Sequence, residues 1–236
     1  MYNNRRIEGI NMPKQNHSVK NSAHFNWFRT MWQYVVCKFI YMIRLKLIYR
    51  IEVHGYENIP KNNRYIVCPN HLSTLDPPMI AGIMPRSVAF MAKKELFDIP
   101  LLSWWLDWLG AFPVDRENLS PSTIKTVEAI YGSKWVHGIF PQGTRELPGE
   151  IKEVTKGFAG IARLTKCDVL PVGITGSDEV KWKPFSGKII INIGKIIPYE
   201  KNLDIVRNKW IEQIQELTGF KYTGSTAETG EKIKND

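Results

Sequence analysis

The sequence predicts an α/β protein in which a mostly buried, mixed sheet is flanked by helices. Short apolar runs alternate along the chain with segments of helical periodicity. Most of these runs are too uniformly apolar to have one face in water, which is typical of strands covered on both sides. The chain has 236 residues, of which 43% are hydrophobic and 23% charged, as expected for one globular domain.

Five segments have the pattern of buried strands: residues 64–69, 87–92, 135–141, 168–175 and 188–197. Helices are expected after Asp76, across 100–110, from Pro121, across 153–166 and near 202–217. Ser120 followed by Pro121 is a helix start signal, a capping hydroxyl before a proline at the first helical position. Pro171 lies inside the fourth run, and because proline cannot donate to a ladder we predict a bulge or strand end there.

The segment 24–50 predicts an amphipathic, membrane-associated helix. Its apolar residues recur at steps of three and four: Phe25, Phe28, Trp32, Val35, Val36, Phe39, Ile40 and Ile43. Arg29, Lys38, Arg44 and Lys46 interrupt the run, and a charge at the centre of a spanning helix costs about 2.5–3.5 kcal/mol. We therefore expect the helix to lie in the membrane interface. The alternative is a helix packed on its own domain.

Positive charge is concentrated in the first 50 residues. They hold nine Lys and Arg against Glu8 alone, so +8 of the total +9 lies there. A basic segment suits an anionic surface, either nucleic acid or phospholipid headgroups. No nucleic-acid motif is recognisable, so a membrane phospholipid surface is the expected partner and nucleic acid is not.

These patterns divide the chain into a flexible basic N-terminus (1–23), the amphipathic helix (24–50), one globular domain (51–220) and a disordered polar tail (221–236). Residues 1–23 contain no apolar core of a secretory signal, so we expect the protein at the cytoplasmic face of a membrane. An organelle transit peptide is the alternative, because the segment is poor in acidic residues. The three cysteines have neither CxxC spacing nor an even number, so disulfides and zinc are not expected.

His71 and Asp76 stand five residues apart in NHLSTLDPP, between a predicted strand and a predicted helix. Loops that follow strands in α/β sheets are where ligands usually bind. A histidine there can act as a general base, particularly when a carboxylate stabilises its charged form. Asp76 followed by Pro77 also has the pattern of a helix N-cap, so a structural role is the competing interpretation.

Two further loops carry polar groups. FPQGTRE (140–146) follows another apolar run, and its Gly-Thr-Arg turn offers a flexible backbone, a hydroxyl and a guanidinium that can bind phosphate. LGAFPVDRE (109–117) brings Asp115 and Arg116 after a Trp-rich helix. Taken alone, FPQGTRE is better explained as a surface turn with a solvated arginine.

Together, NHLSTLD (70–76), GAFPVDR (110–116), FPQGTR (140–145) and VLPVGI (169–174) resemble, in order and separation, the four motif blocks of the glycerolipid acyltransferase family. This family includes 1-acylglycerol-3-phosphate acyltransferases. The resemblance covers roughly residues 50–200 and also includes KKELFDIPLL (93–102). It implies an α/β enzyme that acylates a glycerolipid hydroxyl.

The resemblance implies a role for individual residues. His71 matches the catalytic base and Asp76 its partner. The acceptor's phosphate is expected to be bound by Gly143, Thr144, Arg145 and Arg116. Candidate contacts to substrate or donor are Lys94, Gln142 and Pro171. Gln142 departs from the family, which most often has glutamate there, so any role that needs a carboxylate at 142 is in doubt.

The predicted reaction transfers an acyl chain from a thioester to the 2-hydroxyl of 1-acylglycerol 3-phosphate (lysophosphatidate), giving phosphatidate. The donor is acyl-coenzyme A or acyl-acyl carrier protein, and no cofactor or metal is expected. Alternatives are acylation of glycerol 3-phosphate or another lysophospholipid, or a non-catalytic protein that binds lipid or nucleic acid. Ser73 or Cys68 could instead carry a covalent acyl group, although neither lies in a recognised nucleophile motif.

Overall fold

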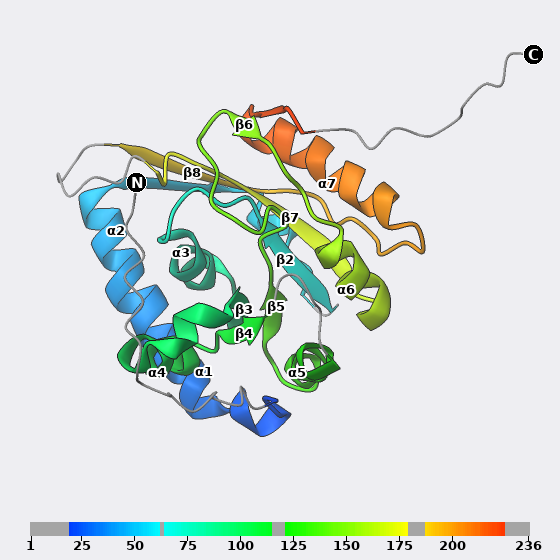
Figure 1. Cartoon of the computed structure of the whole chain (residues 1–236). Helices are drawn as coiled ribbons and strands as arrows, with labels where there is room; N and C mark the ends of the chain where they lie inside the picture. The colour runs from blue at the N-terminus through cyan, green and yellow to red at the C-terminus, as the bar shows by residue number, and fades with distance from the viewer. Residues whose placement is uncertain (1–18, 62–63, 115–120, 179–186, 225–236) are drawn as a thin grey trace, which may run out of the picture.

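The computed structural model describes residues 19–61, 64–114, 121–178 and 187–224 (Figure 1). A seven-stranded sheet has the order β1-β8-β7-β2-β5-β3-β4, and a two-stranded sheet pairs β6 with β9. Neighbours in the large sheet are parallel except β7 and β8, which are antiparallel. The sheet is therefore mixed and mostly parallel, as the sequence predicts.

The strands are β1 (Arg50–His54), β2 (Tyr65–Pro69), β3 (Val88–Lys93), β4 (Phe112–Val114), β5 (Val136–Gly138), β6 (Glu150–Ile151), β7 (Asp168–Thr175), β8 (Lys188–Ile193) and β9 (Lys221–Tyr222). The helices are η1 (Ser22–His24), α1 (Trp27–Gln33), η2 (Tyr34–Tyr41), α2 (Met42–Ile48), η3 (Tyr56–Asn58), α3 (Asp76–Ile83), η4 (Lys94–Asp98), α4 (Pro100–Trp108), α5 (Pro121–Tyr131), α6 (Gly157–Thr165) and α7 (Leu203–Thr218). All five predicted strands and all five predicted helices are present.

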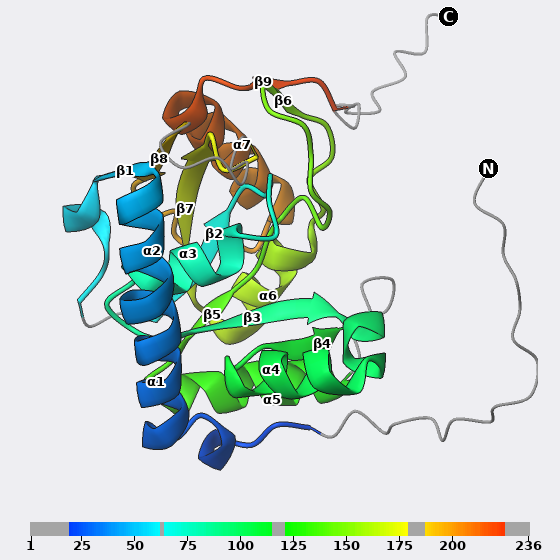
Figure 2. The ribbon, with the colours of Figure 1, turned by 90° about the vertical axis from the view of Figure 1, so that its left-hand side faces the viewer.

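Helices cover both faces of the large sheet (Figure 2). One apolar cluster joins η2, α2 and α3 to one face, and a second joins α5, α6 and α7 to the other. This explains why the strands are apolar throughout: β2 is buried along its whole length, as are the central residues of β7.

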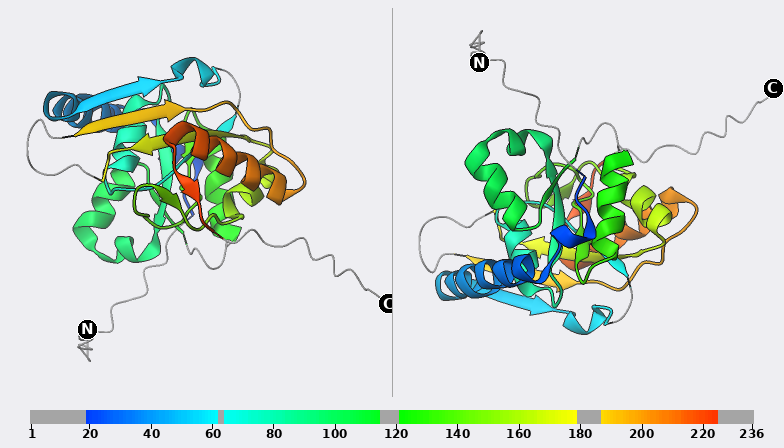
Figure 3. Two further views of the ribbon diagram at one scale, coloured as in Figure 1. Left: turned by 90° about the horizontal axis from the view of Figure 1, so that it is seen from above. Right: turned by 90° about the horizontal axis from the view of Figure 1, so that it is seen from below.

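The N-terminal helix is formed by α1, the π-helical segment η2 and α2, and it runs alongside β1 at one edge of the sheet (Figure 3). Val36 and Cys37 are buried against the domain, whereas Phe28, Phe39 and Leu47 are exposed. One face of this helix is therefore packed on its own domain, as the alternative interpretation expected. The opposite face also carries apolar side chains, and these are exposed. Among the described residues, no helix combines the length and hydropathy needed to cross a membrane.

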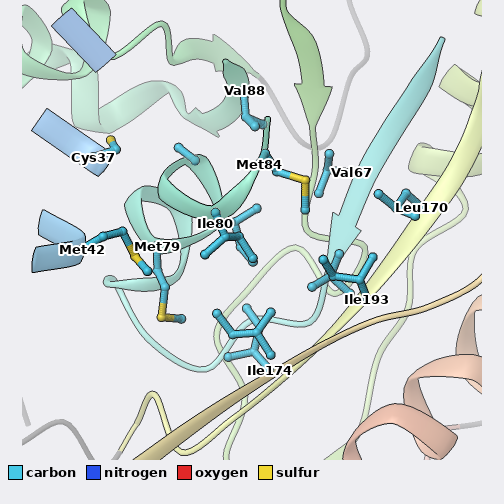
Figure 4. Packing of buried hydrophobic residues seen from close by; sticks show 14 of the residues in the cluster. Cys37, Met42, Val67, Met79, Ile80, Met84, Val88, Leu170, Ile174 and Ile193 are labelled. Atoms are coloured by element: carbon cyan, nitrogen blue, oxygen red, sulfur yellow. The ribbon is translucent and has the colours of Figure 1, made fainter. Parts of the chain in front are cut away.

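Helix α3 lies between the N-terminal helix and the sheet (Figure 4). Met79 and Ile80 are fully buried there, with Cys37 and Met42 on one side and Ile174 of β7 on the other. Burial of each such side chain stabilises the fold by about 1.5–3 kcal/mol. Because α3 follows the His71 loop directly, this packing also fixes one end of that loop.

A polar cluster fastens the start of the chain to α4. Arg29 donates to the carboxylate of Asp107 at 2.7 Å and to its carbonyl, and Lys20 donates to the same carboxylate. Trp32 packs edge-on against two tryptophans of α4, Trp105 and Trp108. Residues 19–23, predicted to be flexible, are therefore attached to the domain, and residues 1–18 lie outside the described part.

The structure corrects two further expectations. β7 is continuous through Pro171, which pairs with Cys68 of β2. Its missing N–H lies on the side where β8 has ended at Ile193, and its carbonyl accepts from Gly194, so the irregularity is in the neighbouring segment. At the start of the tail predicted to be disordered, Lys221 and Tyr222 form β9 and pair with β6, whereas residues 225–236 lie outside the described part.

Candidate active site

Two of the polar loops predicted from the sequence, 70–78 and 140–146, meet where parallel strands of the sheet end. β2, β5 and β3 are parallel, so their carboxyl ends lie together. His71 follows the end of β2, the turn 140–145 follows β5, and Lys93 ends β3. The fold thus brings together residues that are up to 74 positions apart in the sequence.

His71 and Asp76 form a hydrogen-bonded pair. The distance from His71 Nδ1 to Asp76 Oδ2 is 2.9 Å, and the same oxygen accepts the backbone N–H groups of Leu72 at 2.8 Å and Ser73 at 2.7 Å. Asp76 is fully buried. Since a carboxylate accepts from the protonated Nδ1, the other ring nitrogen, Nε2, is left as the basic atom.

Asp76 is not the N-cap that its sequence context suggested. Helix α3 begins at Asp76 itself, its N-cap is Leu75, and no side chain caps it. The carboxylate turns back towards the loop instead and binds the amides of residues 72 and 73. It therefore holds the loop and the imidazole at once.

Phe140 fixes the other side of the imidazole. Its ring stacks on His71 with centroids 4.0 Å apart and an interplanar angle of 24°, and Phe90 stacks on Phe140 in turn at 5.2 Å. The His71 side chain retains 15% exposure. The imidazole is held by Asp76 through one nitrogen and by Phe140 on one face, while it still borders a cavity.

The turn after β5 presents groups suited to an anion. Gly143 N–H donates to the Phe140 carbonyl at 3.0 Å, with Pro141 at the second position, as in a type I turn. Gly143 has a φ of 72°, a left-handed conformation that favours glycine. Among the described residues, the Arg145 guanidinium makes no ion pair and the amides of Thr144 and Arg145 donate to no group, which leaves them available to a phosphate.

A single cavity of about 640 Å³ connects these groups to the N-terminal helix. His71, Lys93, Thr144 and Arg145 line one part of it, which we call the polar end. Its remaining lining is mostly apolar and comes from η2, α3, β3 and α4; we call the part from η2 and α4 the apolar wall, formed by Val36, Cys37, Tyr41, Leu102, Trp105 and Leu106. The size and lining are those of a site for a small, partly apolar ligand.

The remaining predicted site residues lie elsewhere. Gln142 is 3% exposed and does not line the cavity, and its side chain accepts from the His71 N–H and donates to the Glu146 carboxylate. Lys93 lines the cavity, but Lys94 does not. Pro171 is buried in β7 and does not line the cavity. Arg116 lies outside the described residues, so the structure does not place it.

Neither alternative nucleophile borders the cavity. Cys68 is fully buried in β2, and burial raises the pKa of its thiol well above the usual value, so little thiolate is present. The Ser73 hydroxyl accepts from the amide of Leu75 at 3.3 Å. His137, on the neighbouring strand β5, is also buried, and this burial lowers the pKa of its imidazole to about 3.

Sequence reasoning missed Phe140 and Gln33. Phe140 was part of a predicted strand, where an aromatic residue is ordinary, and only its stacking on His71 reveals its place in the site. Gln33 is a buried polar residue of the N-terminal helix that binds Val88 and Leu109 and lines the cavity. Its polarity within an apolar helix was a signal that could have been noticed.

Comparisons with known proteins agree with this geometry. A family model described as acyltransferase matches residues 50–175. The curated 1-acyl-sn-glycerol-3-phosphate acyltransferase of Bacillus subtilis is 33% identical over 69% of this chain and 78% of its own length. The enzyme of that name from Streptococcus pneumoniae is 32% identical over 70% of this chain and 64% of its own.

A solved structure has the same fold. The crystal structure of the 1-acyl-sn-glycerophosphate (LPA) acyltransferase of Thermotoga maritima matches with a TM-score of 0.65 and 26% identity, over 81% of this chain and 80% of that one. The matched family region contains His71, Asp76 and the turn that ends in Arg145. From the family match and the Bacillus relative, we conclude that the chain belongs to the acyltransferase family.

Proposed function

We propose that this acyltransferase transfers an acyl chain from a thioester to the 2-hydroxyl of 1-acylglycerol 3-phosphate, giving phosphatidate. The observation that carries the proposal is that His71 and Arg145 border the polar end of one cavity whose remaining lining is mostly apolar. This arrangement matches an acceptor that has a hydroxyl and a phosphate at one end and an acyl chain at the other.

His71 is the proposed general base. Nε2 takes the proton of the acceptor hydroxyl while that oxygen attacks the thioester carbonyl. The C–S bond then breaks, and the departing thiolate takes up the proton. Asp76, 2.9 Å from Nδ1, stabilises the imidazolium formed on the way. A thiolate leaves readily, so one base and correct orientation supply most of what the reaction needs.

Arg145 is the proposed phosphate ligand, together with the amides of the turn and the Thr144 hydroxyl. The guanidinium is exposed at the cavity, and a phosphate can accept two parallel N–H bonds from it. The backbone N–H of Glu146 donates to the His71 carbonyl at 2.9 Å, so the turn is attached to the loop of the base. A phosphate at Arg145 would therefore place the acceptor next to His71.

An acceptor panel tests the proposal. Purified enzyme is given one acyl-coenzyme A with lysophosphatidate, glycerol 3-phosphate or lysophosphatidylcholine, and products are identified by mass spectrometry. The same panel with acyl-acyl carrier protein identifies the donor. We expect phosphatidate as the main product, and preferential acylation of glycerol 3-phosphate would replace the proposed acceptor.

We also propose that the enzyme works on the surface of a phospholipid membrane, at its cytoplasmic face. The N-terminal helix exposes Phe28, Phe39 and Leu47, and α4 exposes Leu101 and Trp104 beside it. Exposed apolar side chains on two adjoining helices are unusual in a protein surrounded by water alone. The apolar wall comes from the same two elements, so a lipid bound there could reach the cavity from the membrane.

Vesicle sedimentation tests this surface. Phe39→Ser with Leu101→Ser should weaken binding to anionic vesicles at every salt concentration, because apolar burial is lost. Lys46→Glu should weaken it mainly at low salt, because exposed charges are screened. Leu164→Ser is the control, since Leu164 is an exposed leucine of α6 on the opposite face of the sheet. Unchanged binding by the first two variants would contradict the membrane proposal.

A further inference from the structure

Three hydrogen bonds close a ring around the backbone of His71. The His71 N–H donates to Gln142 Oε1 at 2.7 Å, and Gln142 Nε2 donates to Glu146 Oε2 at 2.5 Å. The Glu146 N–H then donates back to the His71 carbonyl at 2.9 Å. Both backbone groups of the proposed base are thus bound by the segment that carries the phosphate turn.

Chemistry fixes the direction of every bond in this ring. The His71 N–H can only donate and an ionised carboxylate can only accept, so the Gln142 amide must turn its oxygen to the former and its nitrogen to the latter. Gln142 is 3% exposed, so water does not substitute for these partners. The Glu146 carboxylate also accepts the amides of Lys152 and Glu153, each at 3.0 Å.

Gln142 and Glu146 therefore form a matched pair. A glutamate at 142 could still accept from His71, but its second oxygen would face the Glu146 carboxylate at the 2.5 Å that now separates nitrogen from oxygen. Two carboxylates that close cannot both be ionised. The sequence has an amide, Gln142, where the family most often has a carboxylate. The structure shows that this amide contacts a carboxylate four residues later, that of Glu146.

We propose that Glu146 is a positioning residue, which acts through Gln142 to hold the His71 loop against the phosphate-binding turn. The inference rests on the proposed function, because it gives a role to a residue that supports the same site. The turn carries Phe140, which stacks on the imidazole, as well as Arg145. Displacing the turn would therefore move the base and the phosphate ligand relative to each other, and a shift of about 1 Å can cost about 100-fold in rate.

A charge-swap cycle tests the inference with Glu146→Gln, Gln142→Glu and the double variant. In Glu146→Gln an amide nitrogen faces a loop N–H, so kcat should fall about five- to tenfold. In Gln142→Glu two carboxylates oppose each other, and kcat at neutral pH should fall tenfold or more, by about the cost of one charge-assisted hydrogen bond. The double variant re-forms the ring with the charge at 142, but the amide nitrogen at 146 that donates to it then faces the Lys152 N–H. Its kcat should therefore exceed that of Gln142→Glu and should be no lower than that of Glu146→Gln.

The pH profile separates positioning from a merely structural role. Wild type should keep its kcat as pH rises above neutral, because the Gln142 amide does not titrate. Gln142→Glu should acquire a new fall in kcat as pH rises, because the proton shared by its two carboxylates is lost. The double variant should lose that alkaline fall again, although its net charge equals that of wild type.

A second measurement does not depend on activity. Destabilisation of Gln142→Glu relative to wild type, measured by urea unfolding, should grow between about pH 5 and pH 8, since the folded state binds an extra proton at low pH. The double variant should not show this trend. Glu153→Gln is the control, because Glu153 is exposed and only its backbone enters the network.

The outcomes distinguish this inference from the proposed function. Kinetics use whichever acceptor the wild type acylates, so another acceptor would change the function without affecting the cycle. Single variants that keep kcat within twofold, or a double variant less active than both singles, would overturn the role of Glu146. If the destabilisation of Gln142→Glu relative to wild type did not change with pH, the role of Glu146 would also be overturned, even if no acceptor were found.

Discussion

The polar end of the cavity and its apolar wall are built in different ways. At the polar end, His71 is held by hydrogen bonds of 2.7–2.9 Å from its ring to Asp76 and from its backbone N–H to Gln142, and Asp76 binds the loop amides in turn. The apolar wall is held by packing, and its helices also expose leucines and aromatic residues such as Leu101 to the outside. Directional hydrogen bonds hold the polar end, whereas the apolar wall is held by the packing of large apolar surfaces.

This difference predicts different responses to substitution. A hydrogen bond has one geometry, so replacing a member of the polar end should lower the rate without a compensating change. An apolar wall tolerates changes of size if volume is conserved and otherwise changes which ligand fits. The polar end should therefore govern the rate of the reaction, and the wall should govern which acyl chain is used and how the enzyme meets the membrane.

The largest expected effect is that of His71→Ala. A positioned general base contributes about 10²- to 10⁴-fold, so acyl transfer should fall by that factor in a steady-state assay. The protein should remain folded, because His71 is partly exposed and follows the end of β2. His137→Ala is a control of the opposite kind: it removes a buried imidazole that does not line the cavity, so it should lower stability more than kcat. Full activity in His71→Ala would remove the distinction between the two regions.

Arg145→Ala should have the next largest effect. Loss of a charge-assisted bidentate contact costs about 1.5–3 kcal/mol, so kcat/KM for lysophosphatidate should fall tenfold or more. Lysine should restore only part of this, because it lacks the planar fork. If the acceptor kinetics were unchanged, the phosphate would have to bind elsewhere, with Lys93 the next candidate at the cavity.

Acid should loosen the attachment of the N-terminal helix. Burial, together with nearby Arg29, lowers the pKa of His24 to about 4, so the folded state favours the neutral ring. The stability this group contributes is therefore present above about pH 6.5 and is lost as pH falls towards about 4. With allowance for partial exposure, the loss is about 1 kcal/mol. Tryptophan fluorescence should report it through Trp32 and its neighbours, and His24→Asn should reduce it, whereas the exposed His54→Asn should not.

The smallest effect concerns chain length and compares two adjacent leucines. Leu102 lines the cavity, whereas Leu101 is 79% exposed. Leu102→Trp should shift the preferred acyl chain to a shorter one, because each methylene that no longer fits costs about 0.8 kcal/mol. Leu101→Trp should leave chain preference unchanged. Competition assays with mixed acyl-coenzyme A donors measure both, and an equal shift in the two variants would show that the cavity does not hold the chain.

The sequence predicted those parts of the molecule whose information is local. His71 and Asp76 are five residues apart on either side of one turn, so their contact needs little tertiary structure. The buried strands were recognisable because both faces are covered. β4 was missed because it has only three residues, and β1 because Glu52 and His54 interrupt its apolar pattern.

Other features depend on residues that only the fold brings together. In the ring, Gln142 is 71 residues and Glu146 is 75 residues after His71, so no local pattern reveals it. Pro171 was expected to end a strand because proline lacks a donor, yet the neighbouring strand stops where that donor would be needed. In both places the deciding contact belongs to another segment of the chain.

The central claim is that His71 activates the acceptor directly, and thiol release measures this most directly. Enzyme is mixed with acyl-coenzyme A alone or with lysophosphatidate, and free thiol is followed on the millisecond scale. We expect no stoichiometric burst without acceptor, rapid release with it, and almost none with acceptor in His71→Ala. A burst without acceptor that disappears in Ser73→Ala or Cys68→Ala would contradict the account, because it would show that the acyl chain passes through a covalent enzyme intermediate.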